Sequence, residues 1–187
     1  MTYRVDKVRK WSAKWIGFGA VQMSWRAPVL PAPYFRRTFH NPAGAVAARV
    51  YFCGLGIGEL YLNGKRVSEA ELDPTPSRYD RHCHYRVHDV ELVPGPNTFG
   101  VILGNGLYNC HTADFWNFDK APWRDYPKLI FELEVDGQSA LFSDSSWRVT
   151  DRGPIRFDGW RNGETYDASH ELGDWAVPEY DDSEWQN

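Results

Sequence analysis

Residues 127–142 read PKLIFELEVDGQSALF and carry the clearest fold signal in the chain. Apolar and polar side chains alternate through the first half of this stretch, which is the pattern of a β-strand with one buried face. Asp136-Gly137 then suits a type I′ turn, so Gln138–Phe142 is predicted to return as the second strand of a hairpin. The apolar residues that we expect to face the core are Leu129, Phe131, Leu133 and Val135.

The surrounding sequence repeats this pattern of strands and turns. Asn63-Gly64 lies inside ELYLNGKRV, residues 59–67, and predicts a second tight hairpin. Pro94-Gly95-Pro96 is a turn segment that no helix can cross. The best helix candidate, Tyr166–Leu172, has about two turns at most. We therefore predict an all-β chain folded as an antiparallel β-sandwich, with short flanking strands and little helix. The other predicted strands are residues 46–53, 84–92, 97–103, 147–150 and 155–157.

Composition and charge agree with an all-β fold and reduce the number of function classes to consider. The chain has 187 residues, which suits one globular domain, and its 16 Gly and 12 Pro favour turns over long helices. A formal net charge of −4 gives no basic excess for phosphates, so no nucleic-acid partner is expected. No apolar run approaches the roughly 20 residues of a membrane span, so no membrane partner is expected either. The sequence as written shows no signal peptide and predicts a cytoplasmic protein, but a trimmed chain would look the same, and the compartment stays open.

The cysteines and histidines give little support for a metal site. Cys53, Cys83 and Cys110 cannot all pair, and we expect free or buried thiols. His82, His84 and His88 would share one face of an extended segment, which leaves a histidine-rich metal site as an alternative. Zinc ligands usually come in two spaced pairs, and no second pair accompanies these histidines. We therefore predict no metal ligand here and interpret the segment as a polar strand face with a buried thiol behind it.

No motif in the chain identifies a catalytic residue. The sequence lacks GxSxG, HExxH, a P-loop and a GxGxxG that opens a helix. The glycines of Gly54–Gly58 lead into a predicted strand, whereas a phosphate cradle needs a helix N-terminus, so we interpret them as a turn or bulge between strands. The many carboxylates allow acid and base pairs to be drawn almost anywhere, and none can be assigned from sequence.

The segment 104–126 is the most distinctive candidate for ligand binding. A Gly-Asn-Gly turn ends a predicted strand and leads into a long stretch in which aromatic residues alternate with Asn, Asp and Arg. Sugars are held by aromatic faces with amide, carboxylate and guanidinium partners beside them. The alternative is that these aromatics anchor the loop or pack against a neighbouring domain. The candidate ligand-binding residues are Tyr108, Asn109, Trp116, Asn117, Trp123 and Arg124.

Several stretches, in order along nearly the whole chain, resemble the N-terminal non-catalytic β-sandwich region of bacterial α-L-rhamnosidases. Leu103–Tyr108 is similar to the family's LGNGWY-type segment, with Leu107 where Trp is common. The other matching stretches are Trp11–Gly17, Ala32–Phe39, Gly58–Val67, Leu72–Pro74, Asn162–Ala168 and Tyr180–Trp185.

This resemblance implies a galactose-binding-like jelly roll that belongs to a larger glycoside hydrolase. It implies that the hydrolytic carboxylates lie in an α-helical barrel elsewhere in the polypeptide, so no catalytic residue is carried over. Some members of this domain class bind L-rhamnose, in certain cases through calcium. No DxDxDG-type loop is present in this sequence, so calcium is not supported by a motif.

The expected domain organisation follows from the strand pattern and the resemblance. Residues 1–40 are predicted to be a flank packed on the sandwich, residues 41–172 the jelly roll, and residues 173–187 an acidic connection toward a missing catalytic part. The acidic composition of the last segment predicts a solvated edge or a linker. Three functions remain as hypotheses: an accessory domain for rhamnose-containing glycosides, a purely structural module that packs on the catalytic domain, and a small self-contained hydrolase. The missing nucleophile motifs and the acidic end count against the third.

Overall fold

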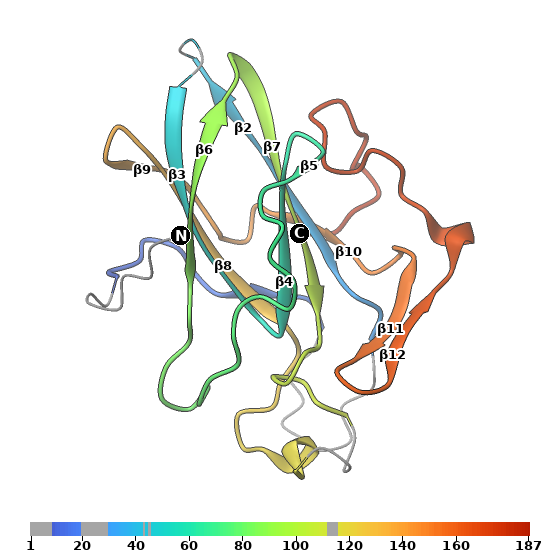
Figure 1. Ribbon diagram of the computed structural model, residues 1–187. Coiled ribbons are helices and arrows are strands. Elements are labelled where there is room, and N and C mark those ends of the chain that lie inside the picture. The colour runs from blue at the N-terminus through green and yellow to red at the C-terminus, as the bar shows by residue number, and fades with distance from the viewer. Residues whose placement is uncertain (1–8, 20–29, 43, 45, 112–115) are drawn as a thin grey trace.

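The computed structural model describes residues 9–19, 30–42, 44, 46–111 and 116–187. Two five-stranded antiparallel sheets face each other, and a separate hairpin stands beside them (Figure 1). The first sheet has the order β1 (Ile16–Gly17), β8 (Lys128–Val135), β3 (Val46–Leu55) and β6 (Arg86–Leu92), with β9 (Gln138–Phe142) also paired to β8. The second sheet has the order β10 (Arg148–Thr150), β2 (Tyr34–Asn41), β7 (Gly95–Gly104), β4 (Ile57–Leu62) and β5 (Lys65–Arg66). The hairpin consists of β11 (Ile155–Gly159) and β12 (Gly163–Tyr166). The prediction of an antiparallel β-sandwich with little helix is confirmed.

Both predicted hairpins form at their expected turns. The φ angles are 48° and 79° at Asn63 and Gly64, and 51° and 76° at Asp136 and Gly137. A type I′ turn needs these left-handed values at both central positions, and Asn, Asp and Gly adopt them at the lowest cost. The turn chemistry therefore sets the register of β4 with β5 and of β8 with β9.

The alternating residues of β8 lie in the core, as predicted. Leu129, Phe131 and Leu133 are fully buried, and Val135 packs at the edge of the same cluster. The ring of Phe131 lies 4.9 Å from that of Phe99 on β7, so the core joins the two sheets.

The helix predicted for Tyr166–Leu172 does not form. Tyr166 is the last residue of β12 and pairs with Ile155, which keeps its backbone extended. Only Ala168–His170 form a single 3-10 turn, in which the Asp167 side chain accepts a hydrogen bond from the backbone N–H of Ser169. The pairing with β11 overrides the weak local preference for helix. A second 3-10 turn spans Phe118–Lys120.

The N-terminal segment crosses the outer face of the first sheet and covers a charged pair there. Glu132 lies on β8 and is only 1% exposed, although it points away from the core. Its carboxylate accepts hydrogen bonds from Arg9 Nη2 at 2.9 Å, from the backbone N–H of Ser12 at 3.0 Å and from the Ser139 hydroxyl. The Arg9 guanidinium carbon also lies 3.4 Å from the ring centre of Tyr51. The segment therefore forms an outer layer on this sheet.

The C-terminal segment, residues 173–187, packs on the outer face of the second sheet (red in Figure 1). Trp175 and Trp185 are buried in a cluster with Tyr34. Gly100 on β7 makes room for this contact, because a Cβ atom there would lie 2.5 Å from the Trp175 ring. The two tryptophans anchor the segment, while its acidic residues other than Asp182 are exposed.

Arg36 on β2 holds residues 173–187 against the second sheet. Its side chain is 2% exposed and donates hydrogen bonds to the backbone carbonyls of Val177 at 2.7 Å and Tyr180 at 3.3 Å. It also pairs with the carboxylate of Asp182. A buried guanidinium is strongly destabilising without such partners, so the end of the described chain is part of the folded unit.

The remaining sequence features lie within the sandwich or on its surface. Cys53, Cys83 and Cys110 are not disulfide-bonded. His82 and His84 are exposed, whereas His88 is half-buried and burial lowers its pKa. In the described ranges, no three His, Cys, Asp or Glu side chains form a group that could hold a metal ion. No helix in those ranges is long and apolar enough to cross a membrane.

Candidate functional site

The candidate site is the long loop that joins β7 to β8 at one end of the sandwich (Figure 1). The root of this loop crosses the turn between β3 and β4 at a pair of glycines. A Cβ atom on Gly56 would lie 2.1 Å from the carbonyl oxygen of Gly104, and one on Gly106 would lie 2.8 Å from the carbonyl carbon of Gly56. Both glycines also have positive φ, at 113° and 52°. The glycines therefore allow the backbones of this turn and of the loop root to cross in close contact. This agrees with the interpretation of Gly54–Gly58 as a turn.

Asp158 on β11 holds the first residue of the loop. Its Oδ1 accepts the backbone N–H of Asn105 at 2.7 Å, and its Oδ2 accepts the side-chain amide of Asn105 at 2.9 Å. Burial raises the pKa of Asp158, although the hydrogen bonds from Asn105 favour its charged form. The carboxylate thus joins the hairpin of β11 and β12 to the root of the loop.

Asn109 and Arg124, two of the predicted ligand residues, continue this network inside the loop. Asn109 is fully buried, and its amide donates to Asn105 Oδ1 at 2.8 Å. Arg124 is 7% exposed and donates to Asn109 Oδ1 at 3.1 Å, to the carbonyl of Asp119 at 3.2 Å and to His111 Nδ1 at 3.2 Å. These side chains hold the two halves of the loop together.

Tyr108 and Trp123 also pack inward. Tyr108 is 7% exposed, and its ring meets that of Tyr79 edge-on at 5.2 Å. Trp123 is half-buried, and its ring centre lies 6.2 Å from that of Tyr79. Tyr79 belongs to the segment between β5 and β6, so the two loops at this end of the sandwich contact each other through these three rings.

Trp116 and Asn117 are the predicted ligand residues that face solvent. Trp116 is 75% exposed, and Asn117 beside it is exposed as well. Both have positive φ, at 50° and 58°, which is uncommon for a residue other than glycine. The ring of Trp116 meets that of Phe118 edge-on, with their centres 6.0 Å apart.

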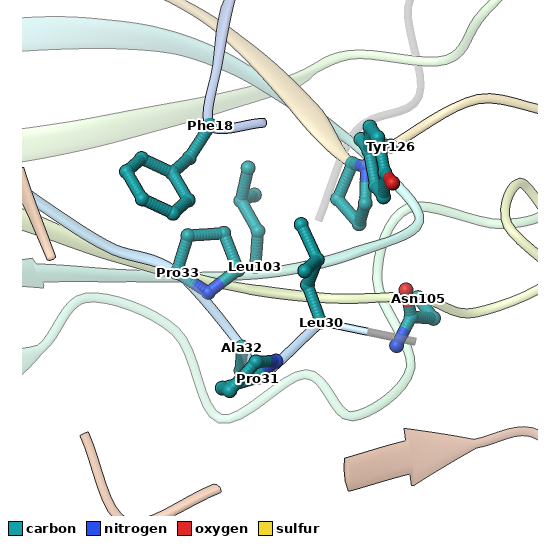
Figure 2. A pocket seen from close by; sticks show the side chains of 9 residues that line it. Phe18, Leu30, Pro31, Ala32, Pro33, Leu103, Asn105 and Tyr126 are labelled. Carbon is teal, nitrogen blue, oxygen red and sulfur yellow. The ribbon is translucent and has the colours of Figure 1, made fainter. Parts of the chain in front are cut away.

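A small cavity lies at the base of the loop, beside Asn105 (Figure 2). Its walls are largely apolar and include Phe18, Pro33, Leu103 and Tyr126. The amide of Asn105 is its main polar feature, and that amide already bonds to Asp158. The cavity therefore offers little to a sugar hydroxyl, and we place the candidate site at the outer part of the loop.

The structure brings together residues that the sequence did not single out. Asn105, Asp158 and Tyr79 come from a strand end, a separate hairpin and a second loop. The Gly-Asn-Gly spacing marked the turn but not the bond from Asn105 to Asp158, and no sequence pattern joins positions so far apart. His111 and Asp119 lie within the predicted loop but were not among its candidate ligand-binding residues, which were aromatic, amide and guanidinium side chains.

Comparison with known proteins identifies a family. Residues 44–187 match the family described as the alpha-L-rhamnosidase N-terminal domain. An alpha-L-rhamnosidase from Formosa agariphila is 40% identical over 164 residues, which cover 82% of this chain and 17% of that protein. An alpha-L-rhamnosidase from Streptomyces avermitilis is 34% identical over 167 residues, covering 85% of this chain and 16% of that protein. The chain thus spans less than a quarter of the length of these relatives.

Solved structures show the same relationship. The alpha-L-rhamnosidase from Dictyoglumus thermophilum superimposes with a TM-score of 0.80 at 36% identity, covering 95% of this chain and 21% of that one. The Streptomyces avermitilis enzyme, solved in complex with L-rhamnose, gives a TM-score of 0.73 at 31% identity, covering 84% and 16%. A Pleurotus ostreatus lectin in complex with GalNAc gives a TM-score of 0.53 at 17% identity, covering 95% and 46%, and shares the fold alone.

Proposed function

The chain belongs to the alpha-L-rhamnosidase N-terminal domain family, and on that premise we propose that it is an accessory domain that helps recognise rhamnose-containing glycosides and is not itself hydrolytic. The longer polypeptide would hydrolyse α-L-rhamnosides with carboxylates outside these residues. No nucleophile or acid motif in the present sequence supports a catalytic role for the domain.

The main support for this proposal is the exposed indole of Trp116, which lies on a loop that buried hydrogen bonds hold in place. A sugar stacks its apolar C–H face on such a ring, and its hydroxyls bond to polar groups beside the ring. Asn117 is the neighbouring amide. The buried bonds of Asn109 and Arg124 keep the loop in place, which reduces the ordering cost of binding.

The roles of the six candidate residues differ under this proposal. Trp116 and Asn117 would contact the sugar, with Trp123 behind them. Tyr108, Asn109 and Arg124 would position the loop, because their side chains are buried. L-rhamnose is the natural probe, since the related Streptomyces avermitilis enzyme was solved with this sugar.

Calcium, which the family resemblance implies for some members, does not fit the side chains described at this end. Calcium takes six to eight oxygen ligands, usually several of them carboxylates. Asp125 is paired with Lys128, and Asp158 is bonded to Asn105. The described ranges contain no group of three potential acidic, His or Cys ligands. We therefore assign no step in sugar binding to a metal ion.

The competing function is a structural module that packs on the catalytic domain without binding sugar. The burial of Tyr108 and the half-burial of Trp123 favour it, because rings that anchor a loop are not available to a ligand. The exposure of Trp116 is compatible with either function, since an interdomain contact would also cover it.

Calorimetric titration of the 187-residue chain with L-rhamnose separates the two functions. We expect weak binding by the wild type, in the range of about 0.1–10 mM for one exposed site. The substitution Trp116→Ala should weaken it by roughly fivefold or more, because a stacked ring contributes about 1 kcal/mol. Trp15→Ala is the matched control, since Trp15 is 43% exposed but lies outside the loop. The absence of any binding by the wild type would favour the structural module.

A further inference from the structure

A small recess lies near the edge of the sandwich, between β4 of the second sheet and β6 of the first. Phe52 and Leu60, both part of the core, line it together with several polar side chains. The space inside it suits a single water molecule or hydroxyl group. The polar side chains are those of Glu59, Arg66, Ser68, Asp73 and His88. None of the described residues that line the recess belongs to the loop 104–126, so the recess is separate from the candidate site.

The charged groups at this recess are paired with one another. Arg66 Nη2 lies 3.2 Å from the carboxylate of Glu59, and Arg86 Nε donates to Asp73 Oδ1 at 2.7 Å. Burial lowers the pKa of His88, so its ring is neutral at pH 7. An ionic ligand would bring a buried charge with no free counter-charge to meet it. The recess therefore suits a neutral ligand.

Three of the lining side chains keep unused hydrogen-bonding capacity. His88 lies on the less exposed face of β6, and its ring nitrogens bond to no described residue. The Ser68 hydroxyl accepts from the backbone N–H of Ala70 at 3.1 Å, and its own proton has no acceptor among the described residues. Asp73 is 8% exposed and uses only Oδ1 in its ion pair. A neutral imidazole, a hydroxyl proton and a carboxylate oxygen together offer both donors and acceptors at one point.

We propose that this recess is a second subsite of the domain, which takes one hydroxyl group of a neutral sugar. A hydroxyl group both donates and accepts, so it can give its proton to Asp73 Oδ2 or to His88 while its oxygen accepts from Ser68. The size of the recess admits such a group but not a whole sugar ring, so the ring would lie at its mouth. The choice of a sugar rests on the proposed function, whereas the recess itself involves neither Trp116 nor its loop.

The ring of His88 provides a local reporter for occupancy of the recess. The Hε1 proton of each imidazole can be followed by NMR while L-rhamnose is added to the 187-residue chain. We expect the His88 signal to shift and to reach saturation, whereas the signals of the exposed His82 and His84 stay in place. A single hydroxyl contact gives weak binding, so the sugar is added to about 100 mM.

Ser68→Ala is the variant that tests the contacts of the subsite. It removes one donor from the recess, so the dissociation constant read at His88 should rise about fivefold, the factor that corresponds to one hydrogen bond. Ser77→Ala is the matched control, because Ser77 lies in the same segment but its hydroxyl donates to the carbonyl of His82, outside the recess. It should leave that dissociation constant unchanged. Trp116→Ala should also leave it unchanged, because the two sites are separate.

The outcomes distinguish the subsite from the proposed function. A saturable His88 shift that weakens in Ser68→Ala but persists in Trp116→Ala supports the subsite. If calorimetry shows binding of L-rhamnose and the His88 signal does not move, the subsite is overturned while the proposed function stands. A His88 shift that is lost in Trp116→Ala, or that grows linearly without saturation, also overturns the subsite. A wild type that shows neither calorimetric binding nor a His88 shift overturns both.

Discussion

Glu132 is a buried carboxylate whose neighbours keep it ionised. Burial raises its pKa, but hydrogen bonds from Ser139 and the backbone of Ser12, together with the charge of Arg9, outweigh this effect and leave the pKa below its usual value of 4.5. Because the folded-state pKa is the lower one, the stabilisation is fully present above the unfolded-state pKa. It is lost as the pH falls through the folded-state pKa.

We therefore expect Glu132→Gln to flatten the acid side of the stability profile. The free energy of unfolding, measured in urea from pH 3 to pH 7, should fall less steeply on acidification in this variant than in the wild type. Glu91→Gln, at an exposed position of β6, is the control and should follow the wild type. Parallel profiles for Glu132→Gln and the wild type would contradict the assignment.

Arg9, the cationic partner of Glu132, should contribute even more to the stability of the protein. Arg9→Met leaves Glu132 buried beside two remaining donors but without its cation, and we expect a loss of about 3 kcal/mol in the free energy of unfolding at pH 7. Arg81→Met, at an exposed position outside this cluster, is expected to change stability little. A loss of similar size in both variants would argue against a special role for the buried pair.

Residue type alone could not sort the candidate ligand residues. Tyr108 and Trp116 belong to one aromatic-rich segment, yet one ring is 7% exposed and the other 75%. The difference comes from Tyr79, which packs against Tyr108 from another loop, and from the left-handed backbone at Trp116. Neither cause leaves a periodic pattern in the sequence, so only the position of the loop was predictable.

At the scale of elements, the predictable parts were those whose cause is local. Strand β8 and its hairpin follow from alternation and from an Asp-Gly turn, and both lie within sixteen residues, 127–142. The helix expected at Tyr166–Leu172 failed because β12 pairs with β11, a contact that the local pattern does not reveal. The hairpin of β11 and β12 is a two-stranded sheet, and such a sheet is marginal in water unless other contacts support it.

Asp158 supplies part of that support, beside the bond from the Ala32 N–H to the Ile155 carbonyl, so Asp158→Ala should loosen the hairpin without unfolding the sandwich. Its loss leaves the backbone N–H of Asn105 without its acceptor, and the side-chain amide keeps only the backbone carbonyl of residue 158, at 3.2 Å. Hydrogen exchange should become faster at the amides of residues 155–166 and 105–109, while residues 129–133 stay protected. Asp89→Ala is the control. It removes an exposed carboxylate of β6 that pairs with Arg49, and it should leave hydrogen exchange in the hairpin unchanged. Uniformly faster exchange would mean that Asp158 supports the whole domain.

At the scale of the whole molecule, both outer faces of the two-sheet sandwich carry a further segment of the chain. The inner faces of the sheets form the expected core, but the N-terminal segment covers one outer face and residues 173–187 cover the other. A flank packed on the sandwich was expected for residues 1–40, but the packing of residues 173–187 could not be predicted, because it rests on contacts between distant positions, such as Arg36 with Asp182. The family match likewise includes the C-terminal cover, since it extends to residue 187.

Trp175→Ala tests whether that cover belongs to the cooperative unit. Truncation of a buried tryptophan leaves a cavity over Gly100 and should cost about 3–5 kcal/mol, observed as a large fall in the melting temperature. Trp116→Ala is the contrasting variant and should change the melting temperature little, because its ring is exposed. Equal effects of the two substitutions would show that the C-terminal segment contributes little to the domain.

The glycine crossing at the root of the loop has a consequence for how such domains diversify. Gly56 and Gly106 touch so closely that neither position tolerates a side chain, whereas residues 116–122 carry their side chains at or near the surface. Selection can therefore act on the tip while the anchor remains invariant, as in the hypervariable loops of antibodies. A combinatorial library over 116–122 is therefore a practical way to vary the surface of the loop on an unchanged scaffold.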